Sequence, residues 1–146
     1  MNDGPPAGLV ASYQRAVYRV LDPDGAFELR IGVHCAELQR WHKRQGVRSS
    51  AFISAANPFS VPTDAARNTA AHERLLGQLK SAGFLAVPGL GEDPDGQWVA
   101  EQCVLVAGIG EAAALRFAAG FNQFAIVFAD HDAVPRLRFT AAASAG

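Results

Sequence analysis

The feature that most constrains this chain is a series of six short apolar segments, interspersed with segments whose apolar residues recur at helical spacing. Each short segment is rich in β-branched or aromatic residues, or alternates apolar with polar residues, as strands do. The predicted strands are residues 27–31, 51–55, 84–87, 98–107, 124–129 and 135–139. Strands interspersed with helices predict a sheet with helices packed against it.

Four segments are predicted to be helical. In the first, Leu9, Tyr13, Val17 and Val20 recur every three or four residues, which predicts an amphipathic helix that ends before residue 22. The other predicted helices are residues 35–45, 63–81 and 111–119.

Several element ends carry residues that favour special backbone conformations. Gly46, Gly83 and Gly120 each follow a predicted last helical turn, where a left-handed residue commonly ends a helix. Thr63 is the predicted N-cap of its helix. The tetrapeptide Asp-Pro-Asp-Gly occurs at 22–25 and again at 93–96, and its residue types are typical of a type I turn.

Length and composition fit one domain. With 146 residues, 49% of them apolar, the chain can bury a core of its own. We predict an α/β fold, with α+β as the alternative: a mixed sheet of about five to six strands with three to four packed helices. The domain is expected to span residues 8–140, between a flexible N-terminus at 1–7 and a flexible tail at 141–146.

Charge and apolar content argue against several classes of protein. Lys and Arg total 13 against 14 Asp and Glu, so nucleic-acid binding through an excess of positive charge is not favoured. No apolar run approaches the roughly 20 residues needed to cross a bilayer, and no basic, apolar leader is present. We therefore expect a cytoplasmic protein with no membrane partner.

The sequence also lacks the cysteine, histidine and glycine motifs of disulfide frameworks, metal sites and dinucleotide sites. Cys35 and Cys103 form no Cys-x-x-Cys pair, which argues against a disulfide framework. The four histidines lack metal-site spacing, and Gly89-Leu90-Gly91 lacks the third glycine of a dinucleotide motif. No metal and no cofactor is predicted.

One candidate site begins where the strand at 51–55 runs into Asn57-Pro58 and Ser60, just before a helix. Ligands in α/β sheets collect at the carboxyl ends of strands and near helix N-termini. The alternative is that Asn57 only turns the chain before Pro58.

The following helix contributes two further candidates. Leu75, Leu79 and Ala82 define its predicted buried stripe, and the same spacing extended backwards reaches His72 and Asn68. His72 is either a ligand contact or general base, or a histidine satisfied within the core.

The last candidates lie on two strands. Strand alternation places Glu101 on the same face as Val99, Cys103 and Leu105, next to Trp98 at the strand start. A buried, unpaired Glu101 would have a raised pKa suited to acid/base work, whereas a pairing arginine would make it a structural ion pair. Gln123 either orients a ligand or satisfies nearby backbone.

Three motifs stand together in the order of a known family. They are Ile53-Ser54-Ala55-Ala56-Asn57-Pro58-x-Ser60, Gly89-x-Gly91-x-Asp93-Pro94-x-Gly96-x-Trp98 and Phe121-x-Gln123-x-Ala125-Ile126. From residue 27 to 137 the chain resembles an uncharacterised bacterial family, domain of unknown function 3293. Its pattern differs here by Ser54 for threonine, Ala56 for tryptophan, and Glu101-Gln102-Cys103 for Glu-Glu-Ser. The resemblance implies a fold and a site location, and no reaction.

Two function hypotheses follow. The first is a small-molecule site with Asn57, Ser60, Asn68, Trp98 and Gln123 as ligand-binding residues and Glu101 with His72 as a candidate catalytic pair; whether the chain is an enzyme stays open. The second is a non-catalytic protein-interaction or regulatory module, with a homo-oligomer as one form, anchored by Trp41 or Phe59 if these are exposed.

Overall fold

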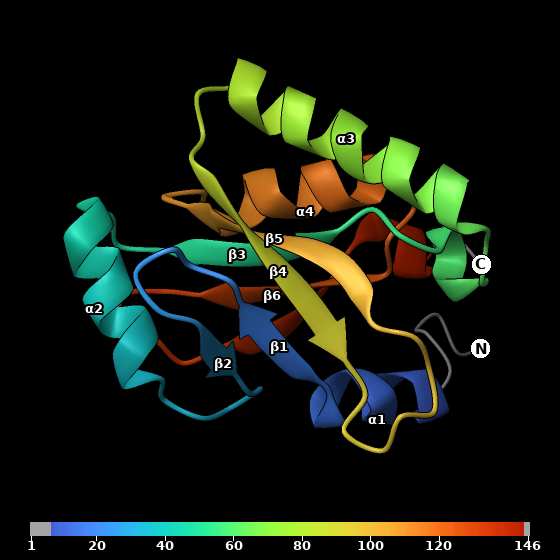
Figure 1. Cartoon of the computed structure of the whole chain (residues 1–146), viewed down its shortest axis with the longest axis horizontal. Coiled ribbons are helices and arrows are strands. Elements are labelled where there is room, and N and C mark those ends of the chain that lie inside the picture. The colour runs from blue at the N-terminus through green and yellow to red at the C-terminus, as the bar shows by residue number, and fades with distance from the viewer. Residues whose placement is uncertain (1–6, 145–146) are drawn as a thin grey trace.

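The computed structural model describes residues 7–144, which form one sheet with helices on both of its faces (Figure 1). Within these residues the helices are α1 Ala7–Arg15, α2 Ala36–Gln45, α3 Ala65–Ser81 and α4 Glu111–Gly120, with short 3-10 turns η1 Pro58–Ser60 and η2 Ala141–Ser144. The strands are β1 Val17–Val20, β2 Phe27–Leu29, β3 Ser50–Ser54, β4 Ala86–Glu92, β5 Glu101–Ala107, β6 Ala125–Ala129 and β7 Arg136–Phe139.

The seven strands follow the order β2-β1-β4-β5-β3-β6-β7. Each ladder in the described part of the chain is antiparallel, so the predicted mixed sheet takes its α+β form. The predicted fold class, one sheet with three to four packed helices, is confirmed, with one strand more than the five to six expected. β5 lies at the centre of the sheet, between β3 and β4.

The additional strand is the one that sequence periodicity assigned to a helix. α1 ends at Arg15, and Val17–Val20 forms β1 instead of continuing the helix. Tyr18 and Val20 are buried while Arg19 between them is half-buried, the alternation expected of a strand. Because β1 pairs with both β2 and β4, its backbone and its β-branched side chains gain partners that an extended helix would not provide.

The sheet separates two hydrophobic cores. On one face α2 packs through Leu38 and Trp41 against side chains of β1, β2 and β5, among them Leu105. On the other face α3 and α4 pack against β3, β5 and β6, with Leu75 and Leu79 at the centre (Figure 1). Trp41 is fully buried, so it is not an exposed anchor.

Element ends differ from prediction at three positions. Gly46 and Gly83 adopt positive φ beyond α2 and α3 as predicted, but Gly120 lies inside α4 and Asn122 takes the left-handed conformation instead. Asp64 caps α3 in place of Thr63, because its carboxylate accepts a hydrogen bond from Arg67 N at 2.8 Å. Ala82 is exposed beyond the end of the buried stripe of α3.

Both predicted turns form, and the structure describes the predicted flexible chain ends only in part. Both Asp-Pro-Asp-Gly turns are confirmed by 3.0 Å hydrogen bonds that join their first and fourth residues. Of the predicted flexible ends, residues 1–6 and 145–146 lie outside the described part, while η2 packs Ala143 against the domain. None of the described helices is long and apolar enough to cross a bilayer.

Gly89 of β4 provides a test of the packing beneath this sheet. A Cβ at Gly89 would lie 2.5 Å from the Phe52 ring and 2.9 Å from the carbonyl oxygen of Arg19. We expect Gly89→Ala to lower the free energy of unfolding by about 2 kcal/mol, because overpacking displaces neighbouring groups. Gly91→Ala is the matched control, since its Cβ would meet only Cys103 Sγ at 3.6 Å. Urea denaturation giving equal losses for the two variants would contradict this packing.

Candidate functional site

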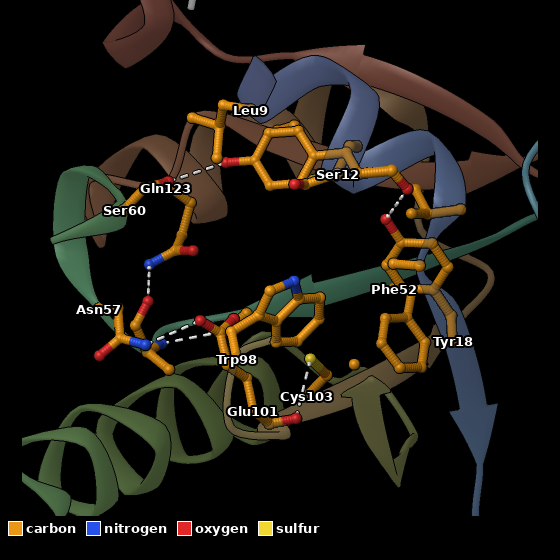
Figure 2. Close-up of a pocket in the computed structure, with 18 of the residues that line it drawn as sticks. Leu9, Ser12, Tyr18, Phe52, Asn57, Ser60, Trp98, Glu101, Cys103 and Gln123 are labelled. Atoms are coloured by element: carbon orange, nitrogen blue, oxygen red, sulfur yellow. Dashed lines mark hydrogen bonds between the residues drawn. The ribbon is translucent and has the colours of Figure 1, made fainter. Parts of the chain in front are cut away.

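A cavity of about 240 Å³ lies between α1 and the sheet face opposite α3 and α4. α1 covers it, and the segment that carries Trp98 closes one side (Figure 2). Twenty residues line it: Leu9, Ser12, Tyr13, Ala16, Tyr18, Phe52, Ser54, Ala56, Asn57, Ser60, Pro62, Gly91, Trp98, Glu101, Cys103, Gln123, Ala125, Ile126, Val127 and Leu137.

The two ends of the pocket differ in chemistry. Figure 2 shows Asn57, Ser60 and Gln123 at one end, and Tyr18 with Phe52 at the other. The Tyr18 and Phe52 rings meet edge to face, with centroids 5.4 Å apart, a favourable aromatic geometry. The pocket thus combines an aromatic end with a polar end, as small-molecule sites commonly do.

Asn57 is the centre of the polar end. Its side-chain Oδ1 accepts hydrogen bonds from Thr63 N at 3.0 Å and from Asn68 Nδ2 at 2.9 Å. Its backbone N donates to Asn68 Oδ1 at 2.9 Å, and its Nδ2 donates to Glu101 Oε1 at 2.8 Å. Asn57 has a left-handed backbone, with φ of 49°, which asparagine tolerates better than most residues.

These contacts determine which way both amides face. The backbone N–H groups of Thr63 and Asn57 can only donate, so the side-chain atoms they meet must be the oxygens of Asn57 and Asn68. Asn57 Nδ2 must therefore point at Glu101 (Figure 2). Asn57 turns the chain and also presents a donor to the pocket carboxyl group.

Glu101 is the one charged side chain among the described residues that line the pocket. No lysine, arginine or histidine nitrogen of the described residues lies within 4.0 Å of its carboxylate, so the predicted alternative of an arginine ion pair is not observed. Burial raises the pKa of Glu101 above its ordinary value, and the hydrogen bond from Asn57 offsets this in part. Because the folded pKa is raised, Glu101 contributes stability below about pH 4.5 that is lost as pH rises through its folded pKa.

Two tyrosines connect α1 to the rest of the pocket. Tyr13 Oη and Ser60 Oγ lie 2.9 Å apart, and Tyr18 Oη donates to the Tyr13 carbonyl oxygen at 2.6 Å. Burial raises the pKa of both phenols, and the charge of Glu101 adds to that rise. Ser60 and Phe59 both have positive φ, so the wall between Asn57 and Val61 is a strained segment.

The remaining predicted residues divide between the pocket and its surroundings. Gln123 lines the pocket, and its Nε2 donates to the Ala56 carbonyl oxygen at 2.8 Å, one of the two roles considered for it. Trp98 and Ser60 also line the pocket, whereas Asn68 stands behind Asn57 and is not among the lining residues.

His72 is not among the lining residues either. It lies on α3, whose buried side chains belong to the core on the opposite face of the sheet from Cys103. Burial lowers the pKa of His72, with Glu73 acting in the other direction. The structure thus brings together Glu101, Asn57, Ser60, Trp98 and Gln123, and does not bring His72 to them.

A second polar pair has the spacing of a nucleophile and a base but is inaccessible. His42 Nε2 and Ser50 Oγ lie 2.7 Å apart, and their residues are only 4% and 0% exposed. This pair connects α2 to β3 inside the protein. No three histidine, cysteine, aspartate or glutamate side chains converge as a metal site anywhere in residues 7–144.

Sequence reasoning did not assign several lining residues to the site, among them Ser12, Tyr13, Tyr18 and Phe52. Tyr13 was assigned to the apolar stripe of an amphipathic helix, which is consistent with its packing but does not reveal what it covers. The available signal was the run of β-branched and aromatic residues at 17–20. It would have separated α1 from β1 and identified Tyr18 as a strand residue.

The Asn57 network can be tested with glycine, which accepts a left-handed backbone without strain. We expect Asn57→Gly to lower the free energy of unfolding by about 2 kcal/mol, because three side-chain hydrogen bonds are lost. Asn122→Gly is the matched control: Asn122 is also left-handed, at φ of 56°, and is exposed. An Asn57→Gly loss no larger than that of the control would show that Asn57 only turns the chain.

Comparison with known proteins gives one match. The family described as protein of unknown function (DUF3293) matches residues 53–126, half of the chain, from β3 to β6. No curated protein and no solved structure matches significantly. The matched span contains Asn57, Trp98, Glu101 and Gln123, while α1 and β1 lie before it. The chain therefore belongs to the DUF3293 family.

Proposed function

We propose that this protein binds a small molecule in the pocket beneath α1, with Glu101 as the polar anchor. The observation that carries the proposal is the combination of a partly enclosed cavity of about 240 Å³ with a partly buried carboxyl group that lines it. Pockets that are mostly apolar and hold a few directed polar groups are the usual form of ligand sites.

The cavity volume bounds the ligand. A dry cavity of roughly 150 Å³ accommodates benzene, so one of about 240 Å³ has room for roughly ten non-hydrogen atoms. A ligand of this size would contact both Tyr18 and Asn57, because the two lie at opposite ends of the pocket (Figure 2).

A catalytic form of this function would use Glu101 for proton transfer. Its raised pKa brings the carboxyl group closer to neutral pH, where an acid or base is most effective. The fixed Asn57 amide would hold the carboxyl group in place during the reaction. We further propose, as the sequence predicts, a bacterial cytoplasmic protein, which its two free cysteines support.

A pocket-filling variant tests the binding function. Ser12 lies on α1 and lines the pocket, whereas Gln14 on the same helix is exposed. We expect a fragment screen by ligand-observed NMR and thermal shift to find compounds that raise the Tm of the wild type, since a ligand of the folded state stabilises it. Ser12→Trp should reduce their affinity at least tenfold, and Gln14→Trp should leave it unchanged.

Hits that bind both variants equally would place the ligand elsewhere. A screen without hits for the wild type would count against the binding function. Far-ultraviolet circular dichroism of both variants serves as the folding control.

A second candidate function, a protein-interaction module that can form a homo-oligomer, is favoured by one exposed patch. Phe59 is 49% exposed and Val61 62% exposed, on the strained segment beside the pocket. Apolar side chains displayed on a loop are common anchors of protein contacts.

Light scattering tests this second candidate. If the patch joins copies of the chain, the wild type should have a mass of twice 15.4 kDa or more, and Phe59→Asn should return it to the monomer. Asparagine is chosen because position 59 has a left-handed φ of 57°. A wild type that is monomeric at high concentration would contradict self-association through Phe59.

A further inference from the structure

Among the described residues that line the pocket, the charge-bearing side chain is an acidic one, Glu101. Among its lining residues the titratable side chains are Glu101 and Cys103 on β5, Tyr13 on α1 and Tyr18 on β1. Burial raises the pKa of Cys103 and of both tyrosines, so all three are neutral near pH 7. Any charge that the pocket carries is therefore the negative charge of Glu101.

This charge has an incomplete set of partners. Of the described groups, Glu101 accepts a hydrogen bond from Asn57 Nδ2 and forms no ion pair. A carboxylate can accept about four hydrogen bonds, so most of its capacity remains for a ligand. Glu101 is partly buried, so its carboxylate loses part of its hydration without gaining a cation, and a cationic ligand would supply the missing interaction.

Aromatic side chains surround the same space. Trp98, Tyr13, Tyr18 and Phe52 all line the pocket. The faces of such rings attract cations, most strongly when water is excluded. The carboxylate therefore selects for positive charge, the rings favour an aromatic or apolar body that carries it, and the lack of a basic residue among the described lining residues disfavours an anion.

We propose that the pocket selects a small organic monocation, a protonated amine or amidine carried on an aromatic or apolar body of roughly ten non-hydrogen atoms. This inference rests on the proposed binding function and adds the chemical class of the ligand. The cationic nitrogen donates to Glu101 at the polar end, and the apolar body lies toward Tyr18 and Phe52 (Figure 2).

The inference has a pH signature. Burial raises the pKa of Glu101, so at acidic pH the empty pocket holds a neutral acid, and a bound cation favours the ionised form. Binding of a cation then releases a proton, and the affinity rises with pH until Glu101 is ionised in the free protein. The affinity for a neutral ligand does not rise with pH in this way; it is independent of pH or falls as the pH rises.

Size-matched probes test the inference by isothermal titration calorimetry. We use 2-phenylethylammonium and benzamidinium as cations, 2-phenylethanol as the neutral analogue and 3-phenylpropanoate as the anion. We expect both cations to bind at least tenfold more tightly than 2-phenylethanol at pH 7, and 3-phenylpropanoate to bind least. The affinity of the cations should fall as the pH is lowered toward 4.

Glu101→Gln separates charge from shape. Glutamine can still accept the hydrogen bond from Asn57, so we expect the variant to fold and to lose at least tenfold in affinity for the cations while 2-phenylethanol is unaffected. Glu73→Gln, an exposed change of the same charge on α3, is the control and should change neither affinity.

The two proposals fail in different ways. If 2-phenylethanol binds as tightly as the cations and Glu101→Gln alters neither, the pocket binds ligands but the class is wrong. If neither cation binds, the inference on ligand class is overturned. If the fragment screen also finds no compound sensitive to Ser12→Trp, the binding function fails as well.

Discussion

Asn57 connects three parts of the chain that meet at one edge of the pocket. Its side chain joins the segment after β3 to the start of α3 through Thr63 and Asn68, and to the first residue of β5 through Glu101. Because these hydrogen bonds fix the orientation of both amides, the group that faces Glu101 is always a donor. The position of the pocket carboxyl group thus depends on a single asparagine.

The sheet determines what the pocket can contain. Alternation along β5 directs Cys103 and Leu105 toward the face covered by α1 and α2, and Val104 and Val106 toward α3 and α4. The α3–α4 face is filled by apolar contacts around Leu75. On the other face the cover changes from α2 to α1, and the cavity lies beneath α1.

Local signals predicted most of the fold. The strands at β3, β5 and β6 and the helices α2, α3 and α4 were predictable because alternation, helical spacing and turn residues are short-range features. β1 was misassigned because apolar residues spaced three and four apart, from Leu9 to Val20, fit a helix, and pairing with β2 and β4 decides for a strand. Burial against distant strands is a tertiary effect that overrides local periodicity.

The candidate site was predictable in part for the same reason. The sequence analysis grouped Asn57 and Glu101 in one small-molecule site, and the two side chains meet through a 2.8 Å hydrogen bond. His72 was grouped with them because it precedes Leu75 on the same helix stripe, but that stripe packs on the opposite face of the sheet. The cover provided by Tyr13 depends on contacts between segments far apart in the sequence, for example Tyr13 with Ser60 and Arg15 with Asp95, which no local pattern contains.

Glu101 is a partly buried carboxyl group whose position depends on Asn57 and that has no cationic partner within residues 7–144. A ¹³C NMR titration of the Glu101 side chain in the wild type and in Asn57→Gly tests it most directly. We expect a pKa above the ordinary value of 4.5 in the wild type, and a higher one in the variant, because the donor that lowers it is removed. A wild-type pKa at or below 4.5, or one that Asn57→Gly leaves unchanged, would contradict it.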